Sequence, residues 1–303
     1  MSFSSDTKAE LCTISLSRRC CAVAEAYGVL LYCNMFNHEE IRIVTSNSEF
    51  AQRLPKLFQK AFGQGFDPSP SFKIKGKKSF SIRDKNTIDT IFSAYGYEAE
   101  TVLAHHINLG VLEESCCKAA FLRGAFLAGG SISDPEKSYH LELVTPHYNV
   151  SRETFYILLE LGFSPKDTAR GGNYVIYFKQ SEAIEDLLTL AGAPVSAMGI
   201  MSAKVEKSMR NSINRKVNCD SANADKIVSA SQEQIEAIKK IERTAGLQSL
   251  TEKLRETAIL RIANPEASLT DLAVLAMPSV SKSCMSHRLR RLLEIARELP
   301  EGE

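Results

Sequence analysis

The sequence lacks an apolar segment long enough to cross a membrane. Its longest apolar runs, such as Val29–Tyr32 and Ala125–Ala128, are far shorter than the roughly 20 residues that a transmembrane helix needs. The opening residues, MSFSSDTKAE, also lack the charged-then-apolar pattern of a secretory signal peptide. These absences argue against a membrane partner and predict a protein of the cytoplasm.

The chain also lacks the cysteine spacing that is typical of metal sites. None of its eight cysteines forms a CxxC pair, and the pairs Cys20–Cys21 and Cys116–Cys117 are each adjacent in sequence. Adjacent residues point to different faces of a helix, so each pair is expected to be a poor metal clamp. Free, buried thiols are therefore expected rather than zinc ligands or disulfides. The sequence predicts no metal, no cofactor and no small-molecule substrate.

A strong excess of one charge is missing as well. The 303 residues carry a net charge of +1, and 24% of them are charged, which is ordinary for a soluble globular protein. The basic residues are nevertheless unevenly placed. Residues 204–216 hold five basic residues and one acid, and residues 282–291 hold four basic residues and no acid. Each stretch is a candidate phosphate contact, with a solvated helix face as the alternative.

What the sequence does contain is an internal repeat. The pair Cys20–Cys21 returns as Cys116–Cys117, and Gly28 returns as Gly124, both after a shift of 96 residues. Each glycine lies in a short apolar helix with small residues on one face. A small-residue face lets two helix backbones approach closely, so the two first helices are expected to pack together. The alternative is a chance similarity between two α+β segments.

Matching elements follow each glycine. Strands with alternating apolar residues are expected at residues 40–47 and 140–147, and each is followed by an amphipathic helix and a hairpin. Each copy closes with a helix, for which Asn86 and Ser181 are the expected N-caps. The sequence therefore predicts a domain of the α+β class, built from two copies that pair about a pseudo-twofold axis.

The last part of the chain indicates an all-α domain with a helix-turn-helix at about residues 268–297. Ser268 and Asp271 have the spacing of a capping box at the start of a short helix, and Ser281 is the expected N-cap of the next helix. A run of apolar residues predicts the inward side of the short helix: Leu269, Leu272, Ala273, Leu275 and Ala276. A small helical dimerisation module with a basic surface is the alternative.

The second helix of this motif supplies the candidate DNA-binding residues. The first residues of a recognition helix contact base edges, and neighbouring basic side chains bind phosphate or guanine. The candidates are Ser281, Lys282, Ser283, Ser286, His287, Arg288, Arg290 and Arg291. Further possible phosphate contacts precede this domain: Lys204, Lys207, Arg210, Asn214, Arg215 and Lys216. The predicted partner is double-stranded DNA.

Residues 122–131, LRGAFLAGGS, resemble the LAGLIDADG helix of homing endonucleases. In that family two such helices form the twofold interface, and an acid at the eighth position of each motif binds Mg²⁺ beside the scissile phosphates. Here the eighth position is Gly129 and, in the first copy aligned through Gly28, Cys33. Neither offers the hard oxygen ligand that Mg²⁺ requires, so we expect no catalytic residue and no enzyme. Residual endonuclease or nicking activity is the alternative.

A degenerate LAGLIDADG pair joined to a helix-turn-helix resembles the WhiA family of sporulation regulators. The resemblance is carried by residues 121–143, 211–227, 250–272 and 280–292. It implies a DNA-binding transcription regulator of Gram-positive bacteria, linked to sporulation in some lineages and to cell division and chromosome segregation in others. The family pattern has Gly and Asn where this chain has Cys284 and Ser286. If Ser286 reads a base, the preferred DNA sequence differs accordingly.

The resemblance also implies how the chain is divided. A non-catalytic LAGLIDADG-like domain at residues 1–200, with repeats at about 10–108 and 113–195, precedes a basic linker at 201–222 and a helical domain at 223–303. The implied location is the cytoplasm, in association with the nucleoid. Another transcription regulator is a candidate second partner, and a purely structural adaptor for other regulators is the remaining alternative.

Overall fold

The computed structural model describes residues 2–63, 76–97 and 104–300. The chain divides into two compact units, Met1–Ser208 and Met209–Glu303. Among the described residues, none of the helices combines the length and the apolar character of a membrane span.

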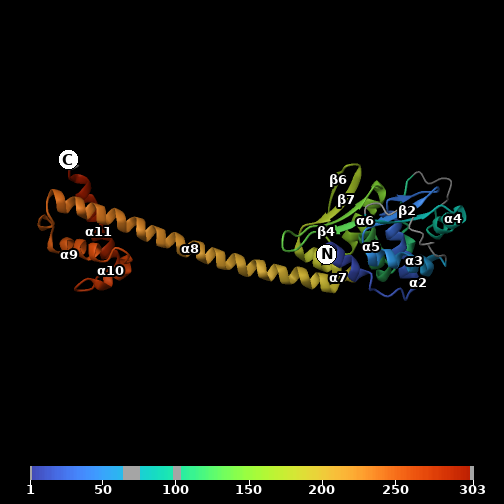
Figure 1. Cartoon of the computed structure of the whole chain (residues 1–303), viewed down its shortest axis with the longest axis horizontal. Coiled ribbons are helices and arrows are strands. Elements are labelled where there is room, and N and C mark those ends of the chain that lie inside the picture. The colour runs from blue at the N-terminus through green and yellow to red at the C-terminus, as the bar shows by residue number, and fades with distance from the viewer. Residues whose placement is uncertain (1, 64–75, 98–103, 301–303) are drawn as a thin grey trace. The chain divides into compact units, whose positions relative to one another are not determined.

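The first unit is a duplicated α+β domain preceded by α1 (Phe3–Leu11). The first copy contains α2 (Arg19–Leu31), β1 (Met35–Phe36), β2 (Ile41–Thr45), α3 (Ser48–Phe62), β3 (Lys78–Ile82) and α4 (Lys85–Ala94). The 3₁₀ helix η1 (Leu109–Leu112) separates the copies. The second copy contains α5 (Ser115–Gly129), β4 (Gly130–Ile132), β5 (Leu141–Thr145), α6 (Tyr148–Glu160), β6 (Lys166–Arg170), β7 (Asn173–Phe178) and α7 (Ser181–Ala191). Figure 1 draws the first copy in blue to teal and the second mainly in green.

Each copy builds its own antiparallel sheet. The strand order is β1-β2-β3 in the first copy and β4-β5-β7-β6 in the second. The central strands β2 and β5 lie at residues 41–45 and 141–145, and both bury alternate side chains. Successive side chains of a strand point to opposite faces, so this alternation turns one face of each sheet toward the helices. The strands predicted at residues 40–47 and 140–147 are therefore confirmed.

The helices α2 and α5 cross at the two repeated glycines. A Cβ atom built on Gly28 would lie 2.1 Å from the carbonyl oxygen of Phe121, and one built on Gly124 would lie 2.0 Å from that of Glu25. Because Glu25 and Phe121 are themselves 96 residues apart, the two contacts are the same contact made in both directions. This reciprocity confirms the predicted pseudo-twofold pairing through small residues.

A buried ion cluster joins the two copies beside this crossing. The Glu25 carboxylate is fully buried, with Oε1 2.6 Å from Nε of Arg53 and Oε2 2.8 Å from Nε of Arg123. Nη2 of Arg53 also donates to Oε2 of Glu25 at 2.9 Å, and Nη1 of Arg123 donates to the backbone carbonyl of Ala191 at 2.9 Å. Glu25 therefore has a structural role in the core, where the two arginines pair with a charge that would be costly to bury alone.

The division between the two units falls within the long helix α8 (Pro194–Thr244). Residues 201–222, the predicted basic linker, are helical throughout. In the first unit, the first turns of α8 bury Ala197, Ile200 and Ala203.

The second unit is entirely helical in its described residues. After the last turns of α8 it contains η2 (Leu247–Ser249), α9 (Glu252–Ala263), α10 (Leu269–Leu275) and α11 (Lys282–Glu298), drawn in orange to red in Figure 1. Its core is formed mainly by aliphatic side chains, among them Ile238, Ile241, Ala258, Leu272, Met285, Leu289 and Leu292. The α11 positions at 285, 289 and 292 recur every three or four residues, as in an amphipathic helix with one buried face.

Candidate nucleic-acid interface

The helices α10 and α11 form the predicted helix-turn-helix, and side chains fix the start of both. Ser268 and Asp271 form a capping box, since each side chain accepts a hydrogen bond from the backbone N–H of the other. Ser281 is the N-cap of α11, where its hydroxyl accepts a bond of 3.2 Å from the N–H of Cys284. Both predicted caps are confirmed. The turn between the two helices spans residues 276–281 and ends at the Ser281 cap.

One side of α11 is held in the core and the other is open to solvent. Met285, Leu289 and Leu292 are buried. On the opposite side, Ser283, His287 and Arg290 are exposed at the spacing of one helix face, with the half-buried Ser286 between them. Lys282 and Arg291 are exposed as well.

This exposed side is electrostatically positive at the start of α11. Within the described residues, Lys282 and Arg290 make no ion pair, whereas Arg291 pairs with Glu294 at 2.9 Å. No acid lies between residues 282 and 291, and the N-terminus of a helix carries a partial positive charge from its backbone dipoles. The open side of α11 is therefore suited to a phosphate-bearing ligand.

Arg288 is placed differently from the other candidates. It is half-buried and lines a small cleft that Glu256 and Leu260 of α9 share with Met277 after α10. Its guanidinium group thus lies toward the flank of α11 that packs on α9. The structure brings the other predicted residues together on the first turns of α11 and sets Arg288 apart from the outward face.

The turn of the motif exposes apolar residues that the sequence pattern missed. Leu275 was expected to face inward, but it is 49% exposed, so that prediction is wrong. Val274 and Met277 are 70% and 89% exposed. Leu275 is the last residue of α10, so the helical pattern does not extend to the residues that follow. Exposed apolar side chains beside a recognition helix are of the kind that contacts thymine methyl groups.

The second predicted set of phosphate contacts divides into two groups on α8. Lys204 forms an ion pair with Glu182, and Lys207 donates to the carbonyl of Pro135 at 2.7 Å and lies over the ring of Tyr139. These two lysines are thus bound within the first unit. The other four lie in a stretch whose residues are all exposed: Arg210, Asn214, Arg215 and Lys216.

The two positions that the sequence predicts to replace metal-binding acids, Gly129 and Cys33, are closely packed. A Cβ atom on Gly129 would lie 2.4 Å from the carbonyl oxygen of Val144, so an acidic side chain does not fit there without a shift of backbone. Cys33 is buried, and its thiol lies 3.1 Å from the carbonyl oxygens of both Leu30 and Met35. Burial raises the pKa of Cys33 to about 12, which keeps it a neutral thiol.

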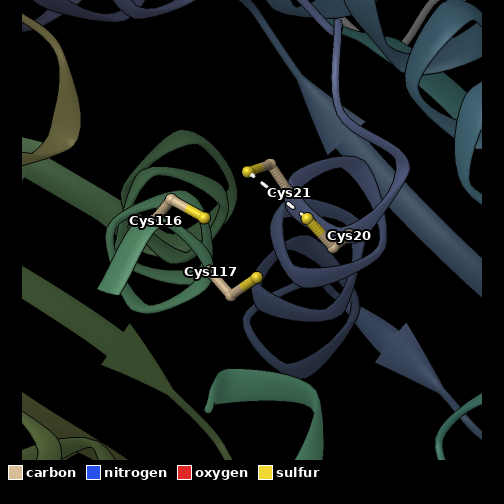
Figure 2. Close-up of side chains that lie close together, drawn as sticks. All are labelled: Cys20, Cys21, Cys116 and Cys117. Atoms are coloured by element: carbon tan, nitrogen blue, oxygen red, sulfur yellow. Dashed lines mark hydrogen bonds between the residues drawn. The ribbon is translucent and has the colours of Figure 1, made fainter. Parts of the chain in front are cut away.

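The cysteines of the repeat are arranged differently from what the sequence predicts. Cys20 is exposed, as is Cys219, so the expectation of buried thiols is wrong for both. The two adjacent pairs also meet, because α2 and α5 lie side by side and each begins with one pair. Figure 2 shows Cys20 and Cys21 turned toward Cys116 and Cys117. The 96-residue shift, combined with the predicted helix pairing, was the signal that could have found this cluster.

Comparison with known proteins agrees with these features. The model of the WhiA C-terminal HTH domain matches residues 213–296, and that of the WhiA LAGLIDADG-like domain matches residues 118–210. Probable cell division protein WhiA of Ruminiclostridium cellulolyticum is 41% identical over 99% of this chain and 98% of its own. The protein of that name from Clostridium botulinum is 36% identical over 100% of both chains.

A solved structure has the same fold over its whole length. The crystal structure of full-length DUF199/WhiA from Thermatoga maritima gives a TM-score of 0.61 at 22% identity and covers 100% of both chains. Similarity therefore extends from end to end, and it includes both the LAGLIDADG-like domain and the C-terminal helix-turn-helix. On this evidence the chain belongs to the WhiA family.

Proposed function

We propose that this chain is a sequence-specific DNA-binding protein that regulates transcription, with α11 as its recognition helix. The observation that carries the proposal is the outward side of α11, where Ser283, His287 and Arg290 are exposed on one face of an acid-free basic run. Hydroxyl and imidazole groups near the start of such a helix contact base edges in the major groove. Guanidinium groups bind guanine in bidentate fashion or bind phosphate.

The proposed contacts follow from the position of each side chain. Ser283, Ser286 and His287 face the bases, and Lys282, Arg290 and Arg291 bind phosphate or guanine. Ser281 offers its hydroxyl hydrogen to a phosphate while its oxygen caps the helix. Arg288, on the flank of α11, is assigned to phosphate rather than to a base.

The exposed basic stretch of α8 is proposed as a second phosphate contact. Asn214, Arg215 and Lys216 supply it, since all three are exposed and adjacent along the helix. Lys204 and Lys207 contribute less, because binding phosphate would require them to leave Glu182 and the Pro135 carbonyl. Such contacts raise affinity for every DNA sequence without selecting among them.

The LAGLIDADG-like domain is proposed to be without nuclease activity. Two-metal phosphodiester cleavage needs carboxylates to place the ions. The packing around Gly129 and the buried neutral thiol of Cys33 support their loss here. Residual cleavage or nicking is tested by incubating supercoiled plasmid with the protein and Mg²⁺ or Mn²⁺. Cleavage that is abolished by a chelator would contradict this part of the proposal.

The relatives named as cell division proteins suggest the process in which the regulated genes act. Cell division is thus our proposed process, and sporulation and chromosome segregation are the other two that the family resemblance implies. The proposed site of action is the nucleoid in the cytoplasm, with another transcription regulator as a candidate partner.

One pair of measurements tests the central proposal. Genome-wide mapping of bound DNA in the native host should give discrete sites with a common sequence near promoters. Fluorescence anisotropy with one such duplex should show an affinity that falls steeply as salt rises, because several phosphate contacts release counterions. A purely structural adaptor predicts no salt-dependent binding to any duplex, and that result would overturn the proposal.

A further inference from the structure

The four cysteines at the helix crossing form a compact sulfur cluster. Their Sγ atoms all lie within 4.8 Å of one another, and that of Cys20 is 4.0 Å from that of Cys21. Two sulfurs come from the first turn of α2 and two from the first turn of α5. Figure 2 shows the two pairs facing each other between the helix ends. From this arrangement we infer that Cys20, Cys21, Cys116 and Cys117 bind one Zn²⁺ ion in a tetrahedral site.

The distances fit a single ion better than a larger cofactor. Zinc binds thiolate sulfur at about 2.3 Å, and a tetrahedron of that size places its four sulfurs about 3.8 Å apart. Four sulfurs that already lie within 4.8 Å of one another need to approach by at most about 1 Å to reach this spacing. An iron–sulfur cluster inserts two or more irons and their sulfides among the cysteines, so its ligands are held farther apart.

Positive charges beside the four sulfurs offset part of the cost of burying thiolates there. Zinc binds the deprotonated sulfur, so coordination releases protons and leaves a net negative charge on the site. The cysteines are the second and third residues of their helices, and the positive ends of both helix dipoles therefore face the cluster. The guanidinium group of Arg18 adds a full positive charge, with Nη1 3.9 Å from Sγ of Cys116.

The site would have a structural role rather than a catalytic one. All four ligands are supplied by the protein, so no position is left open for water or substrate. Because each copy contributes one pair, the ion would join the start of α2 to the start of α5. It would thus cross-link the two copies at the N-terminal ends of α2 and α5. The glycine contact of Gly28 and Gly124 lies later in the same two helices. The exposure of Cys20 gives the ion a route of entry.

The test uses the full-length protein, purified under reducing conditions. We expect about one zinc per chain by elemental analysis after dialysis, as for a closed site with four cysteine ligands. Replacement by Co²⁺ should produce the intense visible bands of a tetrahedral ion and a sulfur-to-cobalt charge-transfer band. Cys20→Ser is the main variant, because an exposed side chain can be changed without disturbing the core. Cys219→Ser is the matched control, since Cys219 is also exposed and lies on α8 outside the cluster.

Both the metal content and the spectrum should be lost in Cys20→Ser and retained in Cys219→Ser. Circular dichroism of the two variants checks that they are folded. A metal-free wild-type protein in which all eight cysteines are reduced thiols and which gives no cobalt spectrum would overturn the inference. An iron–sulfur chromophore, or a disulfide between α2 and α5 that persists in reducing buffer, would overturn it as well.

Discussion

Arg123 on α5 donates its Nε–H to the carboxylate of Glu25 on α2 at a distance of 2.8 Å. The bond runs from the second copy of the repeat to the first, and Arg53 donates to the same carboxylate from α3. All three side chains are largely removed from water. A single acid therefore balances two buried guanidinium groups at the centre of the domain, and both copies depend on it.

We expect Glu25→Gln to destabilise the first unit by about 3–5 kcal/mol, because it leaves two buried arginines without their shared counter-charge. Urea unfolding followed by circular dichroism measures the change. Glu160→Gln is the control, since Glu160 is exposed and its pair with Lys118 is expected to contribute less than about 1 kcal/mol. Equal, small effects of the two substitutions would mean that the buried cluster does not stabilise the fold.

A methyl group at the helix crossing should also be poorly tolerated. In Gly28→Ala the new Cβ atom meets the backbone of α5, which a side-chain movement cannot relieve. We expect a loss of at least about 1–3 kcal/mol, as for other overpacked cores. Gly199→Ala is the control, because Gly199 is also a helical glycine. Its Cβ atom would have ordinary van der Waals contact, since the nearest atom lies 3.4 Å away on the Phe3 ring. That control should be neutral or more stable by up to about 1 kcal/mol.

The proposed recognition helix α11 offers a matched pair of arginines for testing DNA contact. Arg290→Ala should weaken binding to all duplexes and reduce the slope of log affinity against log salt by about 1, if the side chain binds phosphate. Arg297→Ala lies on the same helix, beyond the proposed contact surface, and its side chain is paired with Glu233. In anisotropy titrations at several salt concentrations, the Arg297 variant should have the same affinity and the same salt dependence as the wild type. The opposite ranking would place the DNA on another surface.

Sequence preference gives a separate test of the base-facing assignment. Ser286→Ala should change the set of duplexes selected from a random library, with little change in binding to non-specific DNA, because a hydroxyl that meets a base contributes only to selection. Ser249→Ala, in the same unit but outside the helix-turn-helix, is the control. An unchanged selected sequence in both variants would remove Ser286 from the base contacts.

The stability of the first unit should depend on pH through a pair of histidines. The ring centroids of His105 and His147 are 4.5 Å apart, and burial lowers the pKa of both, that of His147 to about 4. Between pH 6.5 and 4 the unfolded chain binds protons that the folded chain does not bind. The free energy of unfolding should therefore fall as the pH falls through that window, by at most about 1.4 kcal/mol per pH unit for each histidine.

The variant His147→Asn removes one of the two titrating rings and should flatten this slope between pH 7 and pH 5. His287→Asn, which changes an exposed ring of the second unit, should not. Thermal melts at several pH values, without DNA, measure the slope for each. A steeper fall in the His147 variant would contradict the assignment.

The sequence predicts most of the fold because its strongest signals are local. Alternating apolar residues indicate the central strands. Gly28 and Gly124 each indicate that their helix packs closely against another helix, without identifying that second helix. Single cap residues are harder to predict. The N-cap of α4 is Asp84 rather than Asn86, because the carboxylate of Asp84 accepts the N–H of Thr87. The N-cap of α7 is Gln180, and the predicted Ser181 is the first helical residue.

The candidate sites depend more strongly on packing between elements. The outward residues of α11 could be predicted, since the buried and exposed sides alternate at the helical period. The exposure of Leu275 could not be predicted, because Leu275 is the last residue of α10 and the apolar pattern does not indicate where the helix ends. The sulfur cluster also needed tertiary information. Each cysteine pair alone looks unsuited to a metal, and only the crossing of α2 and α5 brings the pairs Cys20–Cys21 and Cys116–Cys117 together.

The reciprocal contact of Gly28 and Gly124 has a consequence for how this domain evolves. Each copy presses its backbone on the place where the other copy lacks a side chain, so neither position can change alone. The two halves can differ in their hairpins, caps and surfaces, but the two glycine positions at the crossing are constrained together. A gene that lost one half would encode a helix with an open groove along it. Neither half is therefore expected to bury its own helix without the other.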